Sequence, residues 1–316
     1  MSAVKALLFA GQGAQYVGMG RDLSAEFAES RGVFAKADHV LGFPLSGLCF
    51  EGPLEELVKT DNCQPAILAV SIAALRAFEA RCPALCKEFS YTAGLSLGEY
   101  SALVAAGALS FEDAVYLVRK RGEFMEEEAR KKPGKMLSVI GMEREAVRNL
   151  CADTNTEIAN LNCPGQIVIS GGAKEIGEAE RLAKDRGAKM ALLLEVSGAF
   201  HSSFMKGASD RLARELDNVQ IHKPRIPVIS NVTARPATTP EEIKGNLVRQ
   251  VASSVLWEDS MRFILSGGAS DFLEFGPGKV LKGLMRRIDG RARVVNVEKK
   301  DDILGCVGGL KGEGLR

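Results

Sequence analysis

The sequence predicts an α/β fold, with a large, mainly parallel sheet covered by helices and a smaller subdomain inserted into the chain. Strands and helices alternate in the first part of the chain and again near its end, which is typical of parallel sheets. Between these parts, the basic segment 130–134 contains Pro and Gly and interrupts the alternation. The next roughly 60 residues follow the order βαββαβ of a ferredoxin-like unit. We therefore expect a large domain of residues 1–132 and 199–316, and an inserted ferredoxin-like subdomain of residues 133–198.

Two strands are expected in the first part of the large domain. Val4–Ala10 is a buried-type apolar run that ends at Gly11-Gln12-Gly13, and Phe89–Ala93 is short and β-prone. Helices are expected where apolar residues recur at three- and four-residue spacing. These helices are Ala25–Val40, Leu54–Lys59, Pro65–Ala80, Leu97–Ala106 and Phe111–Arg130. Ligands of such sheets bind at the carboxyl ends of the strands, where the loops after both strands would lie.

The same reasoning gives the elements of the insertion and of the second part of the large domain. In the insertion we expect strands Lys135–Ile140, Glu157–Asn160, Gln166–Ser170 and Lys189–Leu194, and helices Arg144–Asp153 and Lys174–Arg186. After it we expect strands Pro227–Ser230, Phe272–Phe275 and Arg293–Asn296, and helices Ser203–Leu216, Glu241–Val251, Glu258–Ser266, Lys279–Ile288 and one from Lys300. Alternation thus resumes once the insertion ends.

Composition excludes several classes of protein. The 316 residues carry 41 Lys and Arg against 40 Asp and Glu, a balance that argues against a protein that wraps nucleic acid. No apolar stretch approaches the roughly 20 residues that span a bilayer. The seven cysteines lack a Cys-x-x-Cys pair, which favours reduced thiols in the cytoplasm. With three histidines and no cluster of them, neither a zinc site nor a redox cofactor is implied.

The segment Gly94-Leu95-Ser96-Leu97-Gly98 is the most informative motif. It fits the Gly-x-Ser-x-Gly elbow, which holds a serine on a tight strand-to-helix turn with its hydroxyl exposed. Side chains at the two glycines would crowd that turn, and one glycine is expected to need a positive φ. The motif indicates an α/β-hydrolase-like large domain with Ser96 as its nucleophile. The alternative is a turn without chemistry, which a chain with 33 glycines could form by chance.

A serine nucleophile needs a base, and histidine is the usual one near neutral pH. His39 ends an amphipathic helix, and His222 lies in a polar approach to a strand, so we expect both to be solvated. His201 follows Gly198-Ala199-Phe200, where the large domain resumes ahead of a helix. We therefore favour His201 as the base, with a structural histidine near a helix start as the alternative.

Two further features could serve the same chemistry. The loop Gly11–Gly13 follows a strand without completing a dinucleotide fingerprint, so its N–H groups could supply one oxyanion donor and the N–H of Leu97 the other. On the helix Phe111–Arg130, Arg121 shares a face with Leu117, Phe124 and Met125, at i−4, i+3 and i+4. An arginine rising from an apolar stripe needs a partner, and a carboxylate suits its planar fork. A solvated basic face is the alternative.

Together these motifs resemble the malonyl-CoA:acyl carrier protein transacylase family, acyltransferases that load extender units in fatty-acid and polyketide synthesis. The resemblance runs nearly end to end. Its landmarks are Phe9-Ala10-Gly11-Gln12-Gly13-Ala14-Gln15, Gln64-Pro65-Ala66, Gly94-Leu95-Ser96-Leu97-Gly98-Glu99-Tyr100-Ser101-Ala102-Leu103, Arg121-Gly122, Asn162-x-Pro164-Gly165-Gln166-x-Val168-Ile169-Ser170-Gly171, Gly198-Ala199-Phe200-His201-Ser202, Leu247-Val248-Arg249-Gln250 and Glu274-x-Gly276-Pro277-Gly278-Lys279-Val280-Leu281.

The resemblance implies an activity and a role for each matching residue. A malonyl group would move from malonyl-CoA to acyl carrier protein through an ester on Ser96, with His201 as the base. Arg121 would hold the malonyl carboxylate. The main-chain carbonyl of Gln250 would orient the histidine, in place of an aspartate. The oxyanion hole would be formed by the N–H groups of Gln12 and Leu97.

Two positions depart from the family pattern. Ala10 replaces the usual proline before Gly-Gln-Gly, which changes the rigidity of the loop. Leu95 replaces the usual histidine before the serine, which removes a polar group near the site and affects fine specificity. Phe200 matches the version of its motif associated with malonyl over methylmalonyl donors, because a phenyl ring there would clash with an α-methyl branch.

A serine hydrolase that releases acyl groups to water is an alternative supported by the elbow alone. Such an enzyme would place an acidic residue between the serine and the histidine in the chain. Asp153, Asp185 and Glu195 lie there, but none stands in a matching motif.

A carrier-protein docking module without catalysis is a third interpretation. It would use basic residues to meet an acidic partner, such as Lys279, Lys282, Arg286 and Arg287. These residues also suit an ordinary solvated helix face, and the intact serine and histidine motifs argue for an enzyme.

Overall fold

The computed structural model describes residues 4–309 and confirms the mainly parallel large sheet. Its strand order is β10-β9-β1-β2-β7-β8, in which only β8 runs antiparallel to its neighbour. The strands are β1 (Val4–Phe9), β2 (Phe89–Gly94), β7 (Val228–Ile229), β8 (Pro236–Ala237), β9 (Ala269–Phe275) and β10 (Arg293–Val297). Because β1 and β2 are parallel neighbours, the loops after Phe9 and Gly94 leave the same edge of the sheet.

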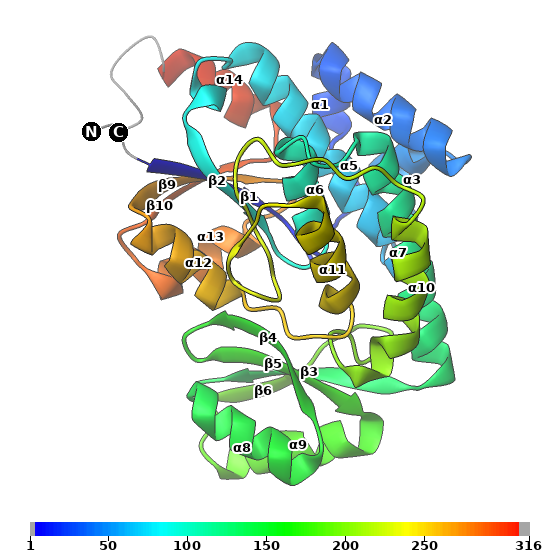
Figure 1. The fold of residues 1–316 in the computed structure, drawn as a ribbon, viewed down its shortest axis with the longest axis vertical. Helices are drawn as coiled ribbons and strands as arrows, with labels where there is room; N and C mark the ends of the chain where they lie inside the picture. Colours follow the sequence, from blue (N-terminus) through cyan, green and yellow to red (C-terminus); the bar gives the residue numbers. More distant parts are fainter. Residues whose placement is uncertain (1–3, 310–316) are drawn as a thin grey trace.

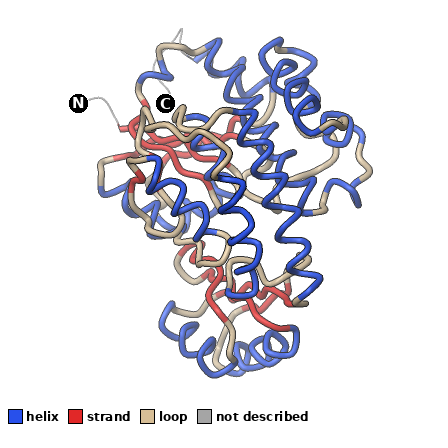
Figure 2. The backbone as a smooth tube through the Cα atoms, turned by 45° about the vertical axis from the view of Figure 1, so that its right-hand side comes forward, coloured by secondary structure: helices blue, strands red, loops and turns tan. Residues whose placement is uncertain are grey.

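Helices cover both faces of this sheet (Figure 2). Side chains alternate along β1, so Leu7 and Phe9 join the core that contains α5, whereas Ala6 and Leu8 join the core that contains α12 and α13. The helices of the large domain are α1 (Arg21–Glu26), α2 (Ala28–Leu41), α3 (Leu45–Glu51), α4 (Leu54–Leu57), α5 (Thr60–Arg81), α6 (Gly98–Ala105), α7 (Phe111–Lys131), α10 (Lys206–Leu216), α11 (Pro240–Gln250), α12 (Trp257–Ser266), α13 (Val280–Ile288) and α14 (Lys300–Gly309).

The insertion forms a second, four-stranded sheet with the ferredoxin-like order β4-β5-β3-β6. Every pairing in it is antiparallel. Its elements are β3 (Gly134–Ile140), α8 (Arg144–Thr154), β4 (Glu157–Cys163), β5 (Gln166–Gly172), α9 (Ala173–Asp185) and β6 (Met190–Leu193). The two helices lie on the face turned away from the large domain (Figure 1). On the other side, Leu161 N–H donates to the carbonyl of Val255, which ties the small sheet to the large domain.

The structure corrects several expected boundaries. The prediction of a single helix over Ala25–Val40 is wrong. The chain is extended at Phe27, and this residue separates α1 from α2. Helix α5 begins at Thr60, so Pro65 lies inside it and does not start it. Helix α3, strand β8 and the short 3-10 turn η1 (Leu85–Lys87) were not expected. The expected helix Ser203–Leu216 begins with a 3-10 turn, η2 (Ser203–Met205), and continues as α10.

Helix α5 is the one described helix whose length and composition would suit a membrane span. However, 83% of its apolar window is buried inside the protein. It packs against α2 and α7 at the centre of the larger core, so it is a core helix.

Candidate active site

Ser96 stands on the elbow between β2 and α6. A Cβ at Gly94 would lie 1.9 Å from the carbonyl carbon of Gly98, and one at Gly98 would lie 2.3 Å from the carbonyl oxygen of Phe9. Close approach therefore explains both glycines. The prediction that one of these two glycines adopts a positive φ is wrong. The residue of the turn with a positive φ is Ser96, at 50°. Left-handed backbone at a non-glycine residue costs about 1–3 kcal/mol and clusters at functional sites.

Asn231 holds this strained turn in place. Its Oδ1 accepts a hydrogen bond of 2.6 Å from the Ser96 N–H, and its Nδ2 donates to the Gly94 carbonyl at 2.8 Å. The sequence reasoning missed Asn231. Its signal was its position just after the short strand β7, at the strand end where site residues of parallel sheets gather.

His201 is the only one of the three histidines near the elbow. Its Nε2 lies 2.8 Å from Ser96 Oγ, and its Nδ1 lies 2.8 Å from the main-chain oxygen of Gln250. A carbonyl only accepts, so Nδ1 carries the proton and Nε2 presents its lone pair to the serine hydroxyl. Burial and the nearby Arg121 guanidinium lower the pKa of His201 to about 4, which keeps the imidazole neutral. His39 and His222 are exposed, as expected.

Arg121 reaches the same hydroxyl from α7 and is 1% exposed. Its Nη2 donates to Ser96 Oγ and to Gln250 Oε1, each at 3.0 Å, and its Nη1 donates to Gln64 Oε1 at 2.7 Å. These three partners are neutral, and Nε has no hydrogen-bond partner among the described residues. Desolvation lowers the pKa of this guanidinium, so it is a buried cation without a directly bound carboxylate.

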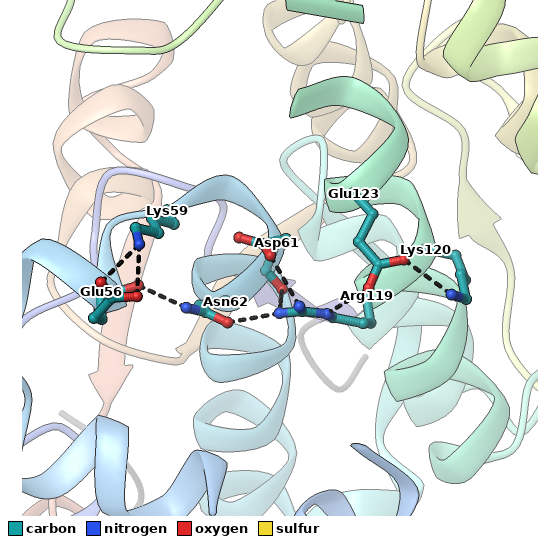
Figure 3. A network of polar contacts seen from close by, with 7 residues as sticks. All are labelled: Glu56, Lys59, Asp61, Asn62, Arg119, Lys120 and Glu123. Carbon is teal, nitrogen blue, oxygen red and sulfur yellow. Dashed lines mark hydrogen bonds and ion pairs between the residues drawn. The ribbon is translucent and has the colours of Figure 1, made fainter. Parts of the chain in front are cut away.

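The neighbouring cations of α7 behave differently. Arg119 forms ion pairs with Asp61 at 2.9 Å and Glu123 at 2.8 Å, and Lys120 pairs with the same Glu123 at 2.9 Å (Figure 3). Leu117, Phe124 and Met125, which were expected to share the face of Arg121, are buried. The solvated-face alternative is therefore wrong for Arg121, whereas Arg119 and Lys120 are partly exposed and paired with carboxylates.

The loop after β1 touches the elbow directly. A Cβ at Gly11 would lie 2.5 Å from the Leu95 carbonyl oxygen, so only a glycine permits this contact. Gln12 is the next residue of that loop. Leu97 occupies the N-cap position of α6, where backbone N–H groups lack acceptors within the helix. The two segments expected to supply oxyanion donors thus meet beside Ser96.

A buried polar network lies beneath these groups. Gln250 Nε2 donates to the Ser96 carbonyl at 2.9 Å and to Glu99 Oε2 at 2.7 Å. Burial raises the pKa of Glu99 to about 7. Sequence reasoning assigned a role to the main chain of Gln250 and none to Glu99, although Glu99 lies in the motif that contains the serine.

Within residues 4–309, no acidic side chain stands behind His201 in the way a hydrolase triad requires, because its Nδ1 faces the main-chain oxygen of Gln250. Asp153 pairs with Arg186 at 2.7 Å, Asp185 pairs with Arg181 at 2.9 Å, and Glu195 is exposed. Among the residues that the structure describes, no three His, Cys, Asp or Glu side chains gather to hold a metal ion.

Comparison with known proteins agrees with this geometry. The model of the acyl transferase domain family matches residues 6–293. A malonyl CoA-acyl carrier protein transacylase of Bacillus subtilis is 47% identical over 313 residues, which cover 98% of each chain. This chain belongs to the malonyl-CoA:acyl carrier protein transacylase family. The family resemblance predicted from the sequence is confirmed.

Solved structures of this family superpose on nearly the whole chain. The acyl-carrier-protein S-malonyltransferase of Bartonella henselae has a TM-score of 0.94 at 39% identity, covering 98% of this chain and 100% of that one. A malonyl-transacylase solved in complex with its type II polyketide acyl-carrier protein has a TM-score of 0.93 at 38% identity, covering 97% and 100%. The family fold, with its inserted antiparallel sheet, is therefore the fold of this chain.

Proposed function

We propose that this protein is a malonyl-CoA:acyl carrier protein S-malonyltransferase that supplies malonyl groups to fatty-acid synthesis. One observation carries the proposal: Ser96 Oγ lies within hydrogen-bond distance of both the neutral His201 Nε2 and the buried Arg121 guanidinium. This arrangement pairs a nucleophile and its base with a cation that has no carboxylate of its own. The names of the relatives, and the carrier-protein complex of one of them, support malonyl-CoA as donor and acyl carrier protein as partner.

In the first half-reaction, His201 Nε2 takes the Ser96 proton as Oγ attacks the thioester carbon of malonyl-CoA. The main-chain carbonyl of Gln250 stabilises the imidazolium, because it accepts from the protonated Nδ1. The N–H groups of Gln12 and Leu97 receive the oxyanion. Collapse of the tetrahedral intermediate breaks the C–S bond, and coenzyme A leaves as a thiol with the proton from His201.

The second half-reaction repeats these steps with a new nucleophile. The pantetheine thiol of acyl carrier protein gives its proton to His201 and attacks the seryl ester. The intermediate collapses to the malonyl thioester, and the proton returns from His201 to Ser96 Oγ. Each half-reaction therefore balances in protons.

Arg121 selects the donor. A malonyl carboxylate that binds its guanidinium supplies the anionic partner that the site lacks, and it holds the thioester carbon beside Ser96. An acetyl group cannot do this, so the cation stays without a counter-charge and the transition state is less stable. Phe200 precedes His201 in the chain and is buried. Its ring would exclude an α-methyl branch by steric clash.

The same proposal covers the organisation and compartment of the chain. The separate sheets support a catalytic domain of residues 1–132 and 199–316 with an insertion of residues 133–198. The six cysteines whose side chains are described are free thiols, which suits the reducing cytoplasm.

The experiment that tests the function uses intact-mass spectrometry. Mixing the protein with malonyl-CoA should give a single malonyl adduct on Ser96, and adding carrier protein should move the adduct to its pantetheine arm. The variant Ser96→Ala should give neither product. Free malonate released faster than carrier protein is acylated would favour the hydrolase instead.

A further inference from the structure

Glu99 is a buried carboxylate at the centre of the site that the chemistry above leaves unused. It lies three residues after Ser96, in the first turn of α6, and is 3% exposed. A buried carboxylate is retained only where hydrogen bonds or charges compensate its desolvation. Its Oε2 accepts from Gln250 Nε2 at 2.7 Å and from the Asn231 N–H at 3.2 Å.

Gln250 connects Glu99 to the reacting groups. The Nε2 of Gln250 donates to Glu99 and to the Ser96 carbonyl, while its Oε1 accepts from Arg121 Nη2 at 3.0 Å. A carboxylate and a carbonyl only accept, so the amide nitrogen must face them and the amide oxygen must face the guanidinium. The main-chain oxygen of the same Gln250 orients His201.

The charged groups Glu99 and Arg121 lie at the two ends of this chain of hydrogen bonds. Tyr100 and Glu99 both act on Arg121 through their fields, and Glu99 is the carboxyl group of the two. The side chain of Gln250 stands between Glu99 and the guanidinium. A direct ion pair would occupy the N–H groups that a substrate carboxylate needs. With the amide between them, the guanidinium has a fixed orientation and no carboxylate directly bound to it, and its Nε has no hydrogen-bond partner among the described residues.

We propose that Glu99 is a positioning residue for malonyl transfer, which fixes the Gln250 side chain so that Arg121 is aimed at the substrate carboxylate beside Ser96. This inference rests on the proposed malonyl transfer. The residue does not touch the substrate and acts through Gln250.

The test compares two variants of Glu99 by their preference for malonyl over acetyl donors. Glu99→Met keeps a side chain of similar length without an acceptor. The assay is run at pH 8, above the pKa of Glu99 of about 7, so that this group is a carboxylate. A hydrogen bond to a charged group contributes about 1.5–3 kcal/mol, so we expect a loss of about 10- to 150-fold in kcat/KM for malonyl-CoA. The ratio of malonyl to acetyl transfer should fall with it. Glu99→Gln keeps an acceptor oxygen for Gln250 and should restore most of both.

Glu274 offers a matched control. It is also fully buried, but its carboxylate accepts from the N–H groups of Leu281 and Lys282 at the start of α13. Glu274→Met should lower the thermal midpoint without changing the donor ratio. If folded Glu99→Met keeps the wild-type ratio, or Glu274→Met changes it equally, the proposal is overturned.

A second variant keeps the test decisive if Glu99→Met does not fold. Gln250→Leu leaves Glu99 and the main-chain carbonyl of residue 250 in place and removes the amide group that joins Glu99 to Arg121 and to the Ser96 carbonyl. It should lower the donor ratio, and an unchanged ratio would reject the positioning role. Failure of the wild-type protein to form a malonyl ester on Ser96 would instead reject the proposed function, so the two failures are distinguishable.

Discussion

Replacing Arg121 with methionine should change which acyl group the protein transfers. Methionine fills a similar volume within the apolar surroundings of the guanidinium but brings no charge. Without the cation, a malonyl carboxylate would enter a buried site with no counter-charge. We therefore expect Arg121→Met to lower malonyl transfer strongly and to leave acetyl transfer unchanged or higher.

The size of the effect follows from the burial of the site. Arg121 is 1% exposed, and its described partners are the neutral oxygens of Gln64, Ser96 and Gln250. Removing one partner of a buried charge pair costs about 2–5 kcal/mol. That range lowers kcat/KM for malonyl-CoA by roughly 30- to several thousand-fold. The lost hydrogen bonds to Gln64 and Gln250 affect both donors alike, so they cancel in the ratio of the two rates.

The assay measures acylation of carrier protein from malonyl-CoA and from acetyl-CoA by intact mass. Arg119→Met is the matched control, because Arg119 lies two residues earlier on α7 and pairs with Asp61 and Glu123 at 24% and 29% side-chain exposure (Figure 3). That variant should keep the wild-type donor ratio. Equal losses with both donors in Arg121→Met would refute the carboxylate role.

Three further predictions concern packing and pH. In Gly122→Ala, the new Cβ would lie 2.6 Å from the Asp61 Cα, so α5 and α7 must separate, and urea unfolding should show a loss of about 1–3 kcal/mol. Gly177→Ala has open space around it and should stabilise α9 by up to about 1 kcal/mol, whereas equal effects of the two substitutions would contradict this reasoning. The pKa of His201 is about 4 in the folded state and 6.5 as its ordinary value. As pH falls from 6.5 to 4, the imidazole therefore gains a proton in the unfolded state but not in the folded state. The free energy of unfolding should then drop by about 3 kcal/mol more in the wild type than in His201→Asn. Burial raises the pKa of Glu274 from 4.5 to about 7, so the folded state keeps a proton that the unfolded state has lost. As pH rises through this window, Glu274→Gln should gain about 3 kcal/mol relative to wild type, and parallel stability curves would contradict that.

Local patterns predicted the main elements because the spacing of apolar residues follows which faces of an element are buried. The stripe on α7 faces the larger core, whereas β1 is a continuous apolar run because its two faces join the two different cores, so both patterns were visible in the sequence. The break at Phe27 was not, since helical spacing continues through it. Its ring is buried with the Arg81 guanidinium 4.2 Å above it, a contact between segments far apart in the chain.

The residues of the candidate site also divide into those that a local sequence motif reveals and those that it does not. Ser96 and His201 stand in motifs whose local geometry is special, and the structure shows that special geometry as positive φ at both residues. Asn231 and Glu99 have no such local signal for their contacts. Asn231 meets the Ser96 N–H across 135 positions of sequence, and the Gln250 side chain meets Glu99 across 151. Such pairings depend on how the strand ends converge, which one sequence does not specify.

The convergence also explains why a neutral acceptor behind the histidine suits this chemistry. An aspartate at the place of the Gln250 carbonyl would put a full negative charge next to His201 and within reach of Arg121. That charge would compete with the malonyl carboxylate for the guanidinium, and it would repel the malonyl carboxylate electrostatically. The carbonyl fixes the same imidazole tautomer through a 2.8 Å hydrogen bond without adding charge. Glu99, the carboxylate present, is held one amide away from the cation. A site that selects an anionic acyl group can therefore orient its base with the main chain and leave its cation to the substrate.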